Sequence, residues 1–164
     1  MLIYLLRHGV AEDGFGIDDA ERALTEDGWR KLRDAAPAWR RLVEDLDVVV
    51  QSPLRRARET AAVLLEAVGG DPKLRTEAML EPGADPQLAM EFLLAELRSS
   101  TDGIALVGHE PHLGALLGLL LTGREHSAVP LKKGMLVAVE LARPTSLIGA
   151  LKFSLSWKAA ARLR

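Results

Sequence analysis

The sequence predicts an α/β fold, a three-layer α/β/α sandwich with a mainly parallel central sheet, with helices on both faces. Three short apolar runs, Leu2 to Leu6, Val48 to Val50 and Ile104 to Val107, each end abruptly in polar residues or glycine. Runs of this length bounded by turn signals are typical of buried strands. Helical apolar patterns lie between the runs, and this alternation favours parallel strands.

The residues that follow the three runs share one chemistry. They are Arg7 and His8 after the first run, Ser52, Arg55, Arg56 and Arg58 after the second, and His109 after the third. Open α/β sheets bind their ligands at the carboxyl ends of the strands. If the three strands lie side by side, two histidines and at least two arginines converge into a site for an anionic group. Taken alone, Arg7 and His8 could equally be a surface pair that ends a strand.

The composition bounds the class of protein. With 164 residues, the chain is expected to form a single domain, residues 1–164, large enough to bury a core. It has no cysteine, which excludes disulfides and a cysteine nucleophile. The 21 basic and 23 acidic residues are interspersed, so nucleic acid is not the expected partner. No apolar stretch has the length of a bilayer span or the form of a signal sequence, so we expect a cytoplasmic protein without membrane association.

The first predicted helix follows a long acidic connection, residues 10–24, which leaves the strand end that carries His8. Such loops are usually functional or mobile, so this one either borders the site or is a solvated loop. Thr25 is the predicted N-cap of the helix, and Pro37 predicts a kink or two consecutive helices. The expected buried face comprises Trp29, Leu32, Ala36, Trp39 and Val43.

The second predicted helix begins at Ser52 and Pro53, with Ser52 as its N-cap. Arg55 can pair with Glu59 on a solvated face, whereas Arg56 lies on the flank, where it can lean over the strand end. The positive potential of the helix N-terminus adds to the same place. The expected buried stripe comprises Leu54, Ala57, Ala61, Leu64, Leu65 and Val68.

The rest of the chain is expected to complete the sheet and its cover. An edge strand is predicted near Leu74 to Thr76, followed by a helix from Asp85-Pro86 whose inward residues are Leu88, Phe92, Leu93 and Leu97. A helix from Pro111 is apolar nearly all round. Two strands, Met135 to Leu141 and Leu147 to Phe153, are joined as a hairpin-like edge, and a short surface helix follows over 158–164.

A phosphoryl group matches this set of residues better than a carboxylate does. Two guanidinium groups bind several phosphate oxygens and stay charged at any working pH. Without cysteine, and with Ser52 expected to act as a cap, histidine is the remaining strong candidate for a nucleophile. Neutral His8 would attack, with its other ring nitrogen bonded to a backbone carbonyl, while protonated His109 would bind the phosphate. No cluster has convincing metal-ligand spacing, so neither a metal nor another cofactor is expected.

Three segments resemble the motifs of the histidine phosphatase superfamily, also called phosphoglycerate-mutase-like: Leu6 to Gly9, Ser52 to Ala61 and Val107 to Pro111. They occur in the family order, and the resemblance extends across nearly the whole chain. It implies that His8 is the phosphorylated nucleophile and that Arg7, Arg56 and His109 form the phosphate pocket. Arg56 matches the family arginine because it directly precedes an alanine and stands four residues after the serine. Gly9 and Glu81 are further expected substrate-binding residues.

Within that superfamily, the chain most resembles the short phosphohistidine phosphatase branch, the SixA type. The similar segments are residues 7–12, 24–28, 82–85 and 133–134. Mutase members carry extra segments that cover the site, for which this chain has little room. An open site suits a phosphorylated side chain on another protein, such as the histidine of a phosphotransfer domain. Many members use a glutamate as general acid, and Glu81 is the candidate, although a phosphohistidine depends less on such an acid.

Three hypotheses follow for the function. The first is a metal-independent phosphatase that hydrolyses phosphohistidine on a protein through a covalent intermediate on His8. The second is a phosphatase of a small-molecule or nucleotide phosphate monoester. The third is a non-catalytic module that binds phosphorylated proteins. The expected partner is therefore a phosphorylated protein or a small phosphate ester.

Overall fold

The computed structural model describes residues 1–99, 101–126, 129–142 and 147–163. The strands are β1 (Leu2–Arg7), β2 (Val48–Gln51), β3 (Lys73–Thr76), β4 (Gly103–Gly108), β5 (Leu136–Leu141) and β6 (Gly149–Leu155). The α-helices are α1 (Glu26–Leu42), α2 (Arg55–Val68), α3 (Pro86–Leu97), α4 (His112–Thr122) and α5 (Trp157–Ala160). Two short 3-10 helices, η1 (Asp19–Glu21) and η2 (Ala78–Leu80), lie in loops.

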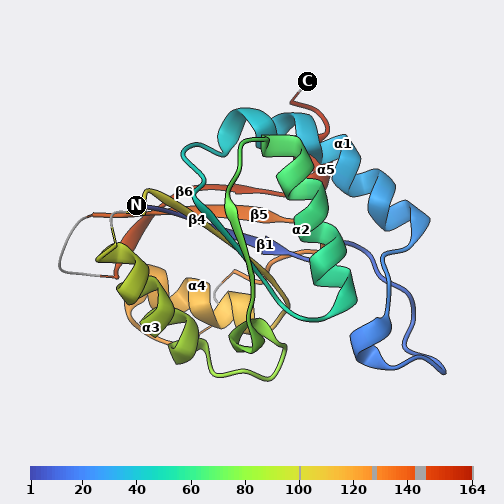
Figure 1. The fold of residues 1–164 in the computed structure, drawn as a ribbon, viewed down its shortest axis with the longest axis horizontal. Helices are drawn as coiled ribbons and strands as arrows, with labels where there is room; N and C mark the ends of the chain where they lie inside the picture. The colour runs from blue at the N-terminus through green and yellow to red at the C-terminus, as the bar shows by residue number, and fades with distance from the viewer. Residues whose placement is uncertain (100, 127–128, 143–146, 164) are drawn as a thin grey trace.

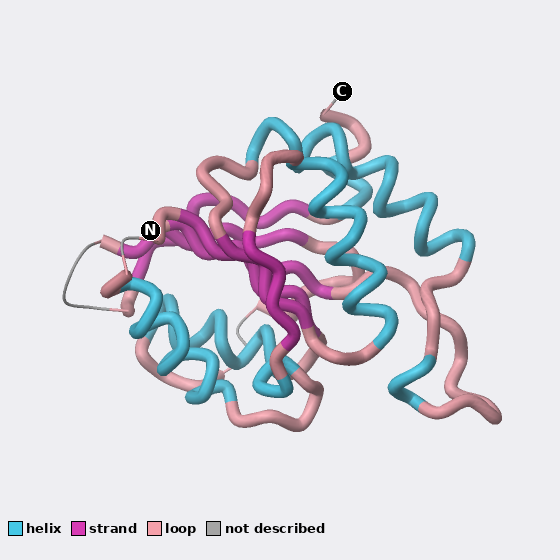
Figure 2. Tube along the Cα trace, viewed as in Figure 1, coloured by secondary structure: helices cyan, strands magenta, loops and turns pink. Residues whose placement is uncertain are grey.

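The strands form one sheet in the order β3-β2-β4-β1-β5-β6. The first four of these run parallel, while β5 pairs antiparallel with β1, and β6 antiparallel with β5. Helices cover both faces of the sheet (Figures 1 and 2). The predicted three-layer α/β/α class with a mainly parallel sheet is confirmed.

Each face of the sheet carries its own apolar layer, because successive side chains of a strand point to opposite faces. In β1, Ile3 and Leu5 pack with α3 and α4, whereas Tyr4 and Leu6 pack with α1, α2 and α5. These four residues are at most 1% exposed. β1 is therefore a central strand that is buried on both faces, as its continuous apolar run predicts.

The register of the parallel strands determines where they end. Arg7 pairs with Gly108, and Gln51 pairs with Val107, so β1, β4 and β2 end at the same edge of the sheet. The next residue of each chain segment therefore leaves the sheet beside the others. This edge is where the sequence predicts the site.

The first predicted helix is the single element α1, capped by Thr25, whose Oγ1 accepts the Gly28 N–H at 3.0 Å. The alternative of two consecutive helices is wrong, because α1 runs through Pro37. Pro37 and Arg33 are both exposed. The Arg33 carbonyl that loses its helical partner therefore faces water, which lowers the cost of an interior proline.

Some side chains lie elsewhere than their patterns predict. Ser52 does not cap the second helix: α2 begins at Arg55 with Leu54 in the N-cap position, and the Ser52 hydroxyl lies before the helix, where it bonds to His109 and accepts the Leu54 N–H at 3.4 Å. Leu88, predicted to face inward, is 49% exposed, and its neighbour Ala89 is buried. The margins of the stripes predicted for α1 and α2 are only half-buried: Trp29, Ala36, Val43, Leu65 and Val68.

The other elements agree with the sequence pattern. Gly69, at φ 69°, ends α2, and β3 is an edge strand as predicted. β5 and β6 pair antiparallel, while residues 143–146 of their connection lie outside the described residues. The tail helix predicted over 158–164 is the shorter α5, which begins at Trp157 and ends at Ala160. Within the described ranges, no helix has the length and apolar character needed to cross a bilayer.

The segment that leaves β1 is held tightly against α1. The Val10 carbonyl accepts the Thr25 N–H at 3.0 Å, and Ala11 forms an isolated bridge with Leu24. A Cβ atom at Gly28 would lie 2.1 Å from the Val10 carbonyl oxygen. Glycine at this position therefore lets α1 pack directly on the chain that follows His8.

We expect Gly28→Ala to lower the free energy of unfolding by about 1 to 3 kcal/mol, because α1 and the Val10 carbonyl must move apart. Urea unfolding followed by circular dichroism measures this change. The matched control is Gly83→Ala, since a Cβ there would meet no atom within 4 Å. Equal losses in the two variants would contradict the packing argument.

Candidate active site

His8 leaves β1 with its imidazole held in one tautomer. Its Nδ1 lies 2.7 Å from the Gly9 carbonyl oxygen, and the residue is 7% exposed. Because a carbonyl can only accept a hydrogen bond, Nδ1 carries the proton and donates it. Nε2 of the neutral ring then has a free lone pair, which is the state that a nucleophile requires.

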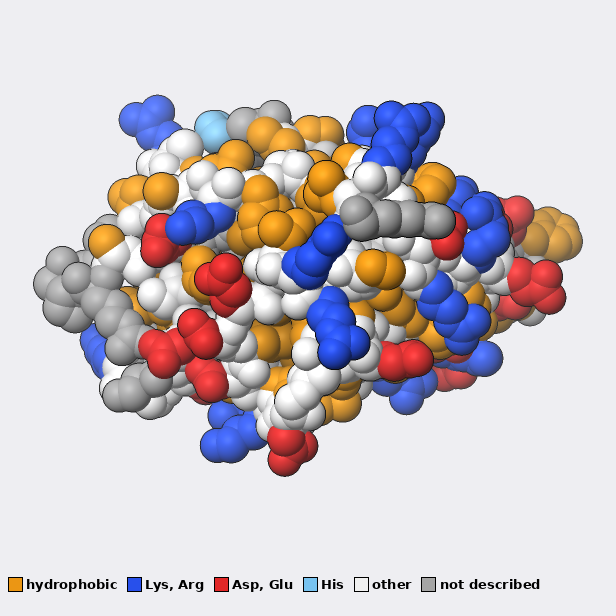
Figure 3. All heavy atoms as spheres, turned by 90° about the horizontal axis from the view of Figure 1, so that it is seen from above, with side chains coloured by type: hydrophobic (Ala, Val, Ile, Leu, Met, Phe, Trp, Pro, Cys, Tyr) orange, Lys and Arg blue, Asp and Glu red, His pale blue; other side chains and the backbone are white. Residues whose placement is uncertain are grey.

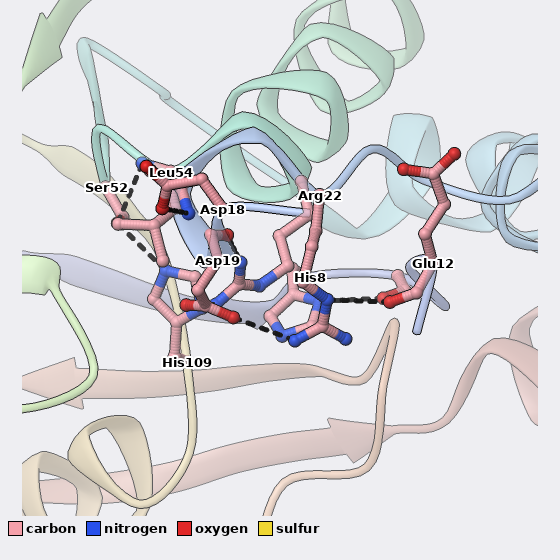
Figure 4. Close-up of polar contacts among 11 residues, drawn as sticks. His8, Glu12, Asp18, Asp19, Arg22, Ser52, Leu54 and His109 are labelled. Atoms are coloured by element: carbon pink, nitrogen blue, oxygen red, sulfur yellow. Dashed lines mark hydrogen bonds and ion pairs between the residues drawn. The ribbon is translucent and has the colours of Figure 1, made fainter. Parts of the chain in front are cut away.

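His109 follows β4 and lies beside His8, with the ring centroids 5.0 Å apart. Its Nε2 lies 2.8 Å from Oγ of Ser52, the residue that follows β2. One hydrogen bond therefore joins the ends of two neighbouring strands and orients the His109 ring (Figure 4). His109 Nδ1 is buried and has no hydrogen-bond partner among the described residues.

Arg56 lies in the first turn of α2, with its side chain 5% exposed. Its Nη1 donates to the Asp19 carbonyl at 2.6 Å, and its Nη2 donates to the Asp19 carboxylate at 3.0 Å. Asp19 belongs to η1, in the loop between β1 and α1, and its carboxylate also accepts a hydrogen bond from Arg22 at 2.8 Å (Figure 4). In the free protein, an internal carboxylate thus binds the guanidinium group that the sequence predicts for an external anion.

Thr60 joins α2 to the segment after His8. Its Oγ1 donates to the Arg56 carbonyl at 2.7 Å and accepts the Gly9 N–H at 3.1 Å. Both backbone polar groups of Gly9 are therefore used within the chain, one by Thr60 and the other by His8. Gly9 therefore holds the His8 ring in place through its backbone. The predicted contact of Gly9 with substrate stays a prediction.

Arg7 is held by the segment that precedes β5. Its Nη1 donates to the Leu131 carbonyl at 2.6 Å, and the Leu131 N–H in turn donates to the Glu110 carboxylate at 2.8 Å. The Gly134 N–H lies 3.1 Å from the carbonyl oxygens of both Arg7 and His8. Nε of Arg7 is buried without a partner in the described part of the chain. Unpaired buried donors are uncommon outside functional sites, and this one adjoins His8.

Burial lowers the pKa of the His8 imidazole to about 3, although its hydrogen bond to Gly9 opposes the shift. The positive charges of Arg56, Arg7 and Lys133 act in the same direction as burial. His8 is therefore neutral near pH 7. This environment favours the form of His8 that can act as a nucleophile.

Burial also lowers the pKa of His109 to about 3, and the proximity of His8 and Arg56 adds to the effect. The Asp19 carboxylate acts in the opposite direction. In the free protein, this environment favours neutral His109 over the protonated form that the sequence analysis expects. The arginines then supply the positive charge of the site.

Glu81 lies directly after η2 and is half-buried. The preceding residue, Leu80, is fully buried, and its carbonyl oxygen would lie 3.4 Å from a Cβ atom at Gly108. The loop that carries Glu81 therefore passes beside the end of β4. Within the described chain, the Glu81 carboxylate forms no hydrogen bond or ion pair, so its predicted role as an acid stays a prediction.

The structure brings Arg7, His8, Arg56 and His109 to one edge of the sheet. Arg55 is exposed and bonds to Glu59 at 2.9 Å, as predicted. Sequence reasoning missed three partners of these residues: Ser52, Thr60 and Asp19. Ser52 carried a usable signal, because it directly follows a strand that ends at the site. Thr60 stands one helical turn after Arg56, whereas nothing in the loop sequence distinguishes Asp19 from its acidic neighbours.

We expect Ser52→Ala to lower the free energy of unfolding by about 1 to 3 kcal/mol, because buried Nε2 of His109 loses its partner. Urea unfolding measures the change. Ser154→Ala, which alters an exposed serine of β6, is the control and should change stability by less than about 0.5 kcal/mol. A Ser52→Ala variant as stable as the parent protein would contradict the assigned hydrogen bond.

The lowered histidine pKa values predict a loss of stability in mild acid. An unfolded histidine binds a proton below about pH 6.5, whereas folded His8 and His109 stay neutral until the pH approaches about 3. The free energy of unfolding should therefore fall by about 2 kcal/mol per buried histidine between about pH 6.5 and 5. Urea unfolding at the two pH values tests this, and His8→Asn should show a correspondingly smaller fall. An identical pH dependence in that variant would refute neutral burial of His8.

Comparison with known proteins agrees with this geometry. A family model described as histidine phosphatase superfamily (branch 1) matches residues 3–82. An uncharacterized protein of Picosynechococcus sp. is 29% identical over 144 residues, which cover 85% of this chain and 84% of that protein.

Solved structures share the whole fold. The protein histidine phosphatase SixA, complexed with tungstate, has a TM-score of 0.87 at 22% identity, over 96% of this chain and 98% of that one. The alpha-ribazole phosphatase of Shigella flexneri has a TM-score of 0.71 at 17% identity, over 96% and 97% of the two chains. These structural similarities establish the fold. The match to the family model shows that residues 3–82 resemble the histidine phosphatase superfamily.

Proposed function

We propose that the protein is a phosphohistidine phosphatase, which hydrolyses phosphohistidine on another protein through a covalent phosphohistidine on His8. The observation that carries this proposal is the hydrogen bond from His8 Nδ1 to the Gly9 carbonyl. It leaves Nε2 unprotonated, beside His109 and within the positive field of Arg56. The similarity to the superfamily supports a phosphatase, and the substrate and residue roles are our proposal.

The reaction has two steps in this scheme. First, His8 Nε2 bonds to phosphorus as the phosphorus–nitrogen bond of the substrate breaks, and the substrate imidazole leaves with the electron pair. An imidazole already protonated on its other nitrogen leaves as a neutral ring, so the leaving atom needs no proton. Second, water attacks phosphorus, the bond to Nε2 breaks, and phosphate leaves while the proton of the water passes to solvent.

Arg7 and Arg56 bind the phosphoryl oxygens in this scheme, and the charge on those oxygens is stabilised in the transition state. Arg56 must then share its guanidinium group with Asp19 or release it. A bound phosphoryl dianion raises the pKa of the adjacent His109, so His109 gains its proton when substrate binds. The scheme assigns no step to a metal ion, because arginines and a protonated histidine supply the positive charge.

Two observations support phosphohistidine as the substrate. The Glu81 carboxylate makes no contact with a described residue that would orient it as an acid, and phosphohistidine needs an acid less than a phosphate ester does. In addition, the structure named as a protein histidine phosphatase has a TM-score of 0.87, against 0.71 for the alpha-ribazole phosphatase. The second candidate function is hydrolysis of a small phosphate monoester. The fold that this chain shares with the alpha-ribazole phosphatase favours this second function. In this case Glu81 would have the role of proton donor.

The test compares two substrates, a phosphotransfer domain phosphorylated on histidine and p-nitrophenyl phosphate. We expect kcat/KM to be higher for the phosphorylated domain. His8→Ala should lower kcat/KM for both substrates by at least about 10,000-fold, because the variant lacks the nitrogen atom that attacks phosphorus in this scheme. Wild-type protein that is quenched during turnover in an alkaline denaturant, which preserves phosphohistidine, should carry phosphate on His8, detected by mass spectrometry.

The control is His126→Ala, which removes an exposed histidine and should leave both rates unchanged. Equal or faster turnover of the ester would reject the substrate assignment in favour of the second candidate. Normal turnover by His8→Ala would reject the covalent mechanism.

A further inference from the structure

The loop between β1 and α1, residues 12–22, is a structured projection. Its base is closed by Arg22, whose Nε donates to the Glu12 carbonyl at 2.7 Å, and by Glu12, whose carboxylate accepts the Ala23 N–H at 3.0 Å. Farther along, the Asp18 carboxylate accepts the Ala20 N–H at 3.1 Å and begins η1. The loop extends from the body at the lower right of Figure 1. These bonds hold its backbone in place without contact from a partner.

The tip of this loop presents a large apolar side chain to solvent. Phe15 is 98% exposed, and Ile17 is 41% exposed. Gly14 and Gly16 flank Phe15, and Gly16 has φ +74°, a conformation that glycine adopts without strain. No other apolar residue described as exposed approaches the exposure of Phe15; the next is Ile148 at 52%. An exposed aromatic ring contributes a large contact area when it is buried against a partner.

The same loop is bonded directly to the candidate active site. Asp19 accepts two hydrogen bonds from Arg56, and Arg56 lies close enough to lower the pKa of His8. Phe15 stands only four residues before Asp19. A macromolecule that delivers a phosphorylated side chain to His8 therefore has this loop beside its path, whereas a small phosphate ester need not touch the tip of the loop.

The loop is also strongly acidic. Residues 12–22 contain five acidic residues and one basic residue, Arg22, which is already bonded to Asp19. Apolar and acidic atoms lie together at the right-hand end of the surface in Figure 3, the end at which the loop lies in Figure 1. The acidic residues of this loop favour a partner that has basic side chains beside an apolar hollow, and they disfavour an anionic membrane.

We propose that residues 12–22 form a docking element for the phosphorylated protein substrate, with Phe15 as its anchor. The proposal rests on the proposed function. The occupant is a folded domain that carries the phosphohistidine, with an apolar hollow beside it for Phe15 and basic side chains facing the carboxylates of the loop. The loop selects protein substrates because only a macromolecule is large enough to contact Phe15 while its phosphoryl group lies at His8.

The test measures kcat and KM of Phe15→Ser with two substrates. Several phosphotransfer domains are first phosphorylated on histidine with phosphoramidate, and the domain that the wild type hydrolyses fastest is the first substrate. The second substrate is p-nitrophenyl phosphate. We expect kcat/KM for the domain to fall about tenfold or more, through KM, as for an aromatic anchor of an interface. Turnover of p-nitrophenyl phosphate should change less than about twofold, since Phe15 contacts no residue of the pocket.

Two further variants complete the design. Phe15→Trp should restore most of the affinity for the phosphorylated domain, because it keeps a large aromatic side chain. Leu151→Ser, which alters a half-exposed apolar residue of β6, should leave KM for both substrates unchanged. Phe15→Ser should also keep the thermal stability of the wild type, since the side chain it removes makes no buried contact.

Each other outcome overturns a different statement. A wild type that hydrolyses only the ester refutes the proposed function and the docking element with it. If the wild type does hydrolyse the domain, an unchanged KM in Phe15→Ser refutes docking alone. Equal losses with both substrates would show that the loop acts only by holding Arg56. If the wild type is a dimer and Phe15→Ser a monomer in analytical ultracentrifugation, Phe15 belongs to a contact between two copies of the chain. If the wild type binds neutral vesicles and Phe15→Ser does not, Phe15 belongs to a lipid-binding surface.

Discussion

Parallel pairing of β4 with β1 on one side and with β2 on the other brings three distant chain segments to one edge of the sheet. In this register, Arg7 stands opposite Gly108, and the following residues, His8 and His109, have their rings in contact range. Ser52 follows β2 and bonds to His109 across the same edge. A shift of one residue in either pair would turn these side chains towards opposite faces. The site therefore depends on the sheet register before it depends on any single contact.

The electrostatics of the pocket follow from its depth in the fold. Burial keeps His8 and His109 neutral, and nearby arginines strengthen that preference. An empty pocket that contained two imidazolium rings and two guanidinium groups would carry four like charges in a small volume. Neutral rings avoid that repulsion, and the Asp19 carboxylate compensates Arg56 directly. In the proposed function, an entering phosphoryl group replaces Asp19 as the partner of Arg56, so that binding exchanges one anionic contact for another.

Much of the fold followed from the sequence because apolar runs and cap residues are local signals. The run Leu2 to Leu6 predicted the central strand, and Thr25 predicted the start of α1. The burial of the two arginines also agrees with the helical pattern: Arg56 is buried and Arg55 is exposed, as the position of each on the helix indicates. Helical periodicity separates two adjacent residues by about 100°, so the distinction needed no tertiary information.

Other features depend on contacts that a local pattern does not contain. Ser52 has the side chain and the neighbouring proline of a helix cap, but the hydroxyl bonds to a histidine 57 residues away. Leu88 and Ala89 are both apolar enough to face inward, and the packing of α3 decides between them. Asp19 sits in a loop with four other acids, and only the three-dimensional path of the loop brings it to Arg56. In each case, tertiary packing overrides a residue preference that is weak by itself.

β1 occupies an unusual place in the order of assembly. It is the first strand of the chain, yet its hydrogen-bonded neighbours, β4 and β5, begin at Gly103 and Leu136. While the chain emerges from a ribosome, the strand that carries His8 therefore has no sheet to join until most of the sequence has been synthesised. Its apolar residues have no strand partner until then, and Arg7 cannot contact Leu131 before that residue has been synthesised. Nascent fragments of this protein should accordingly depend on chaperones longer than those of a protein whose first strand pairs with its second.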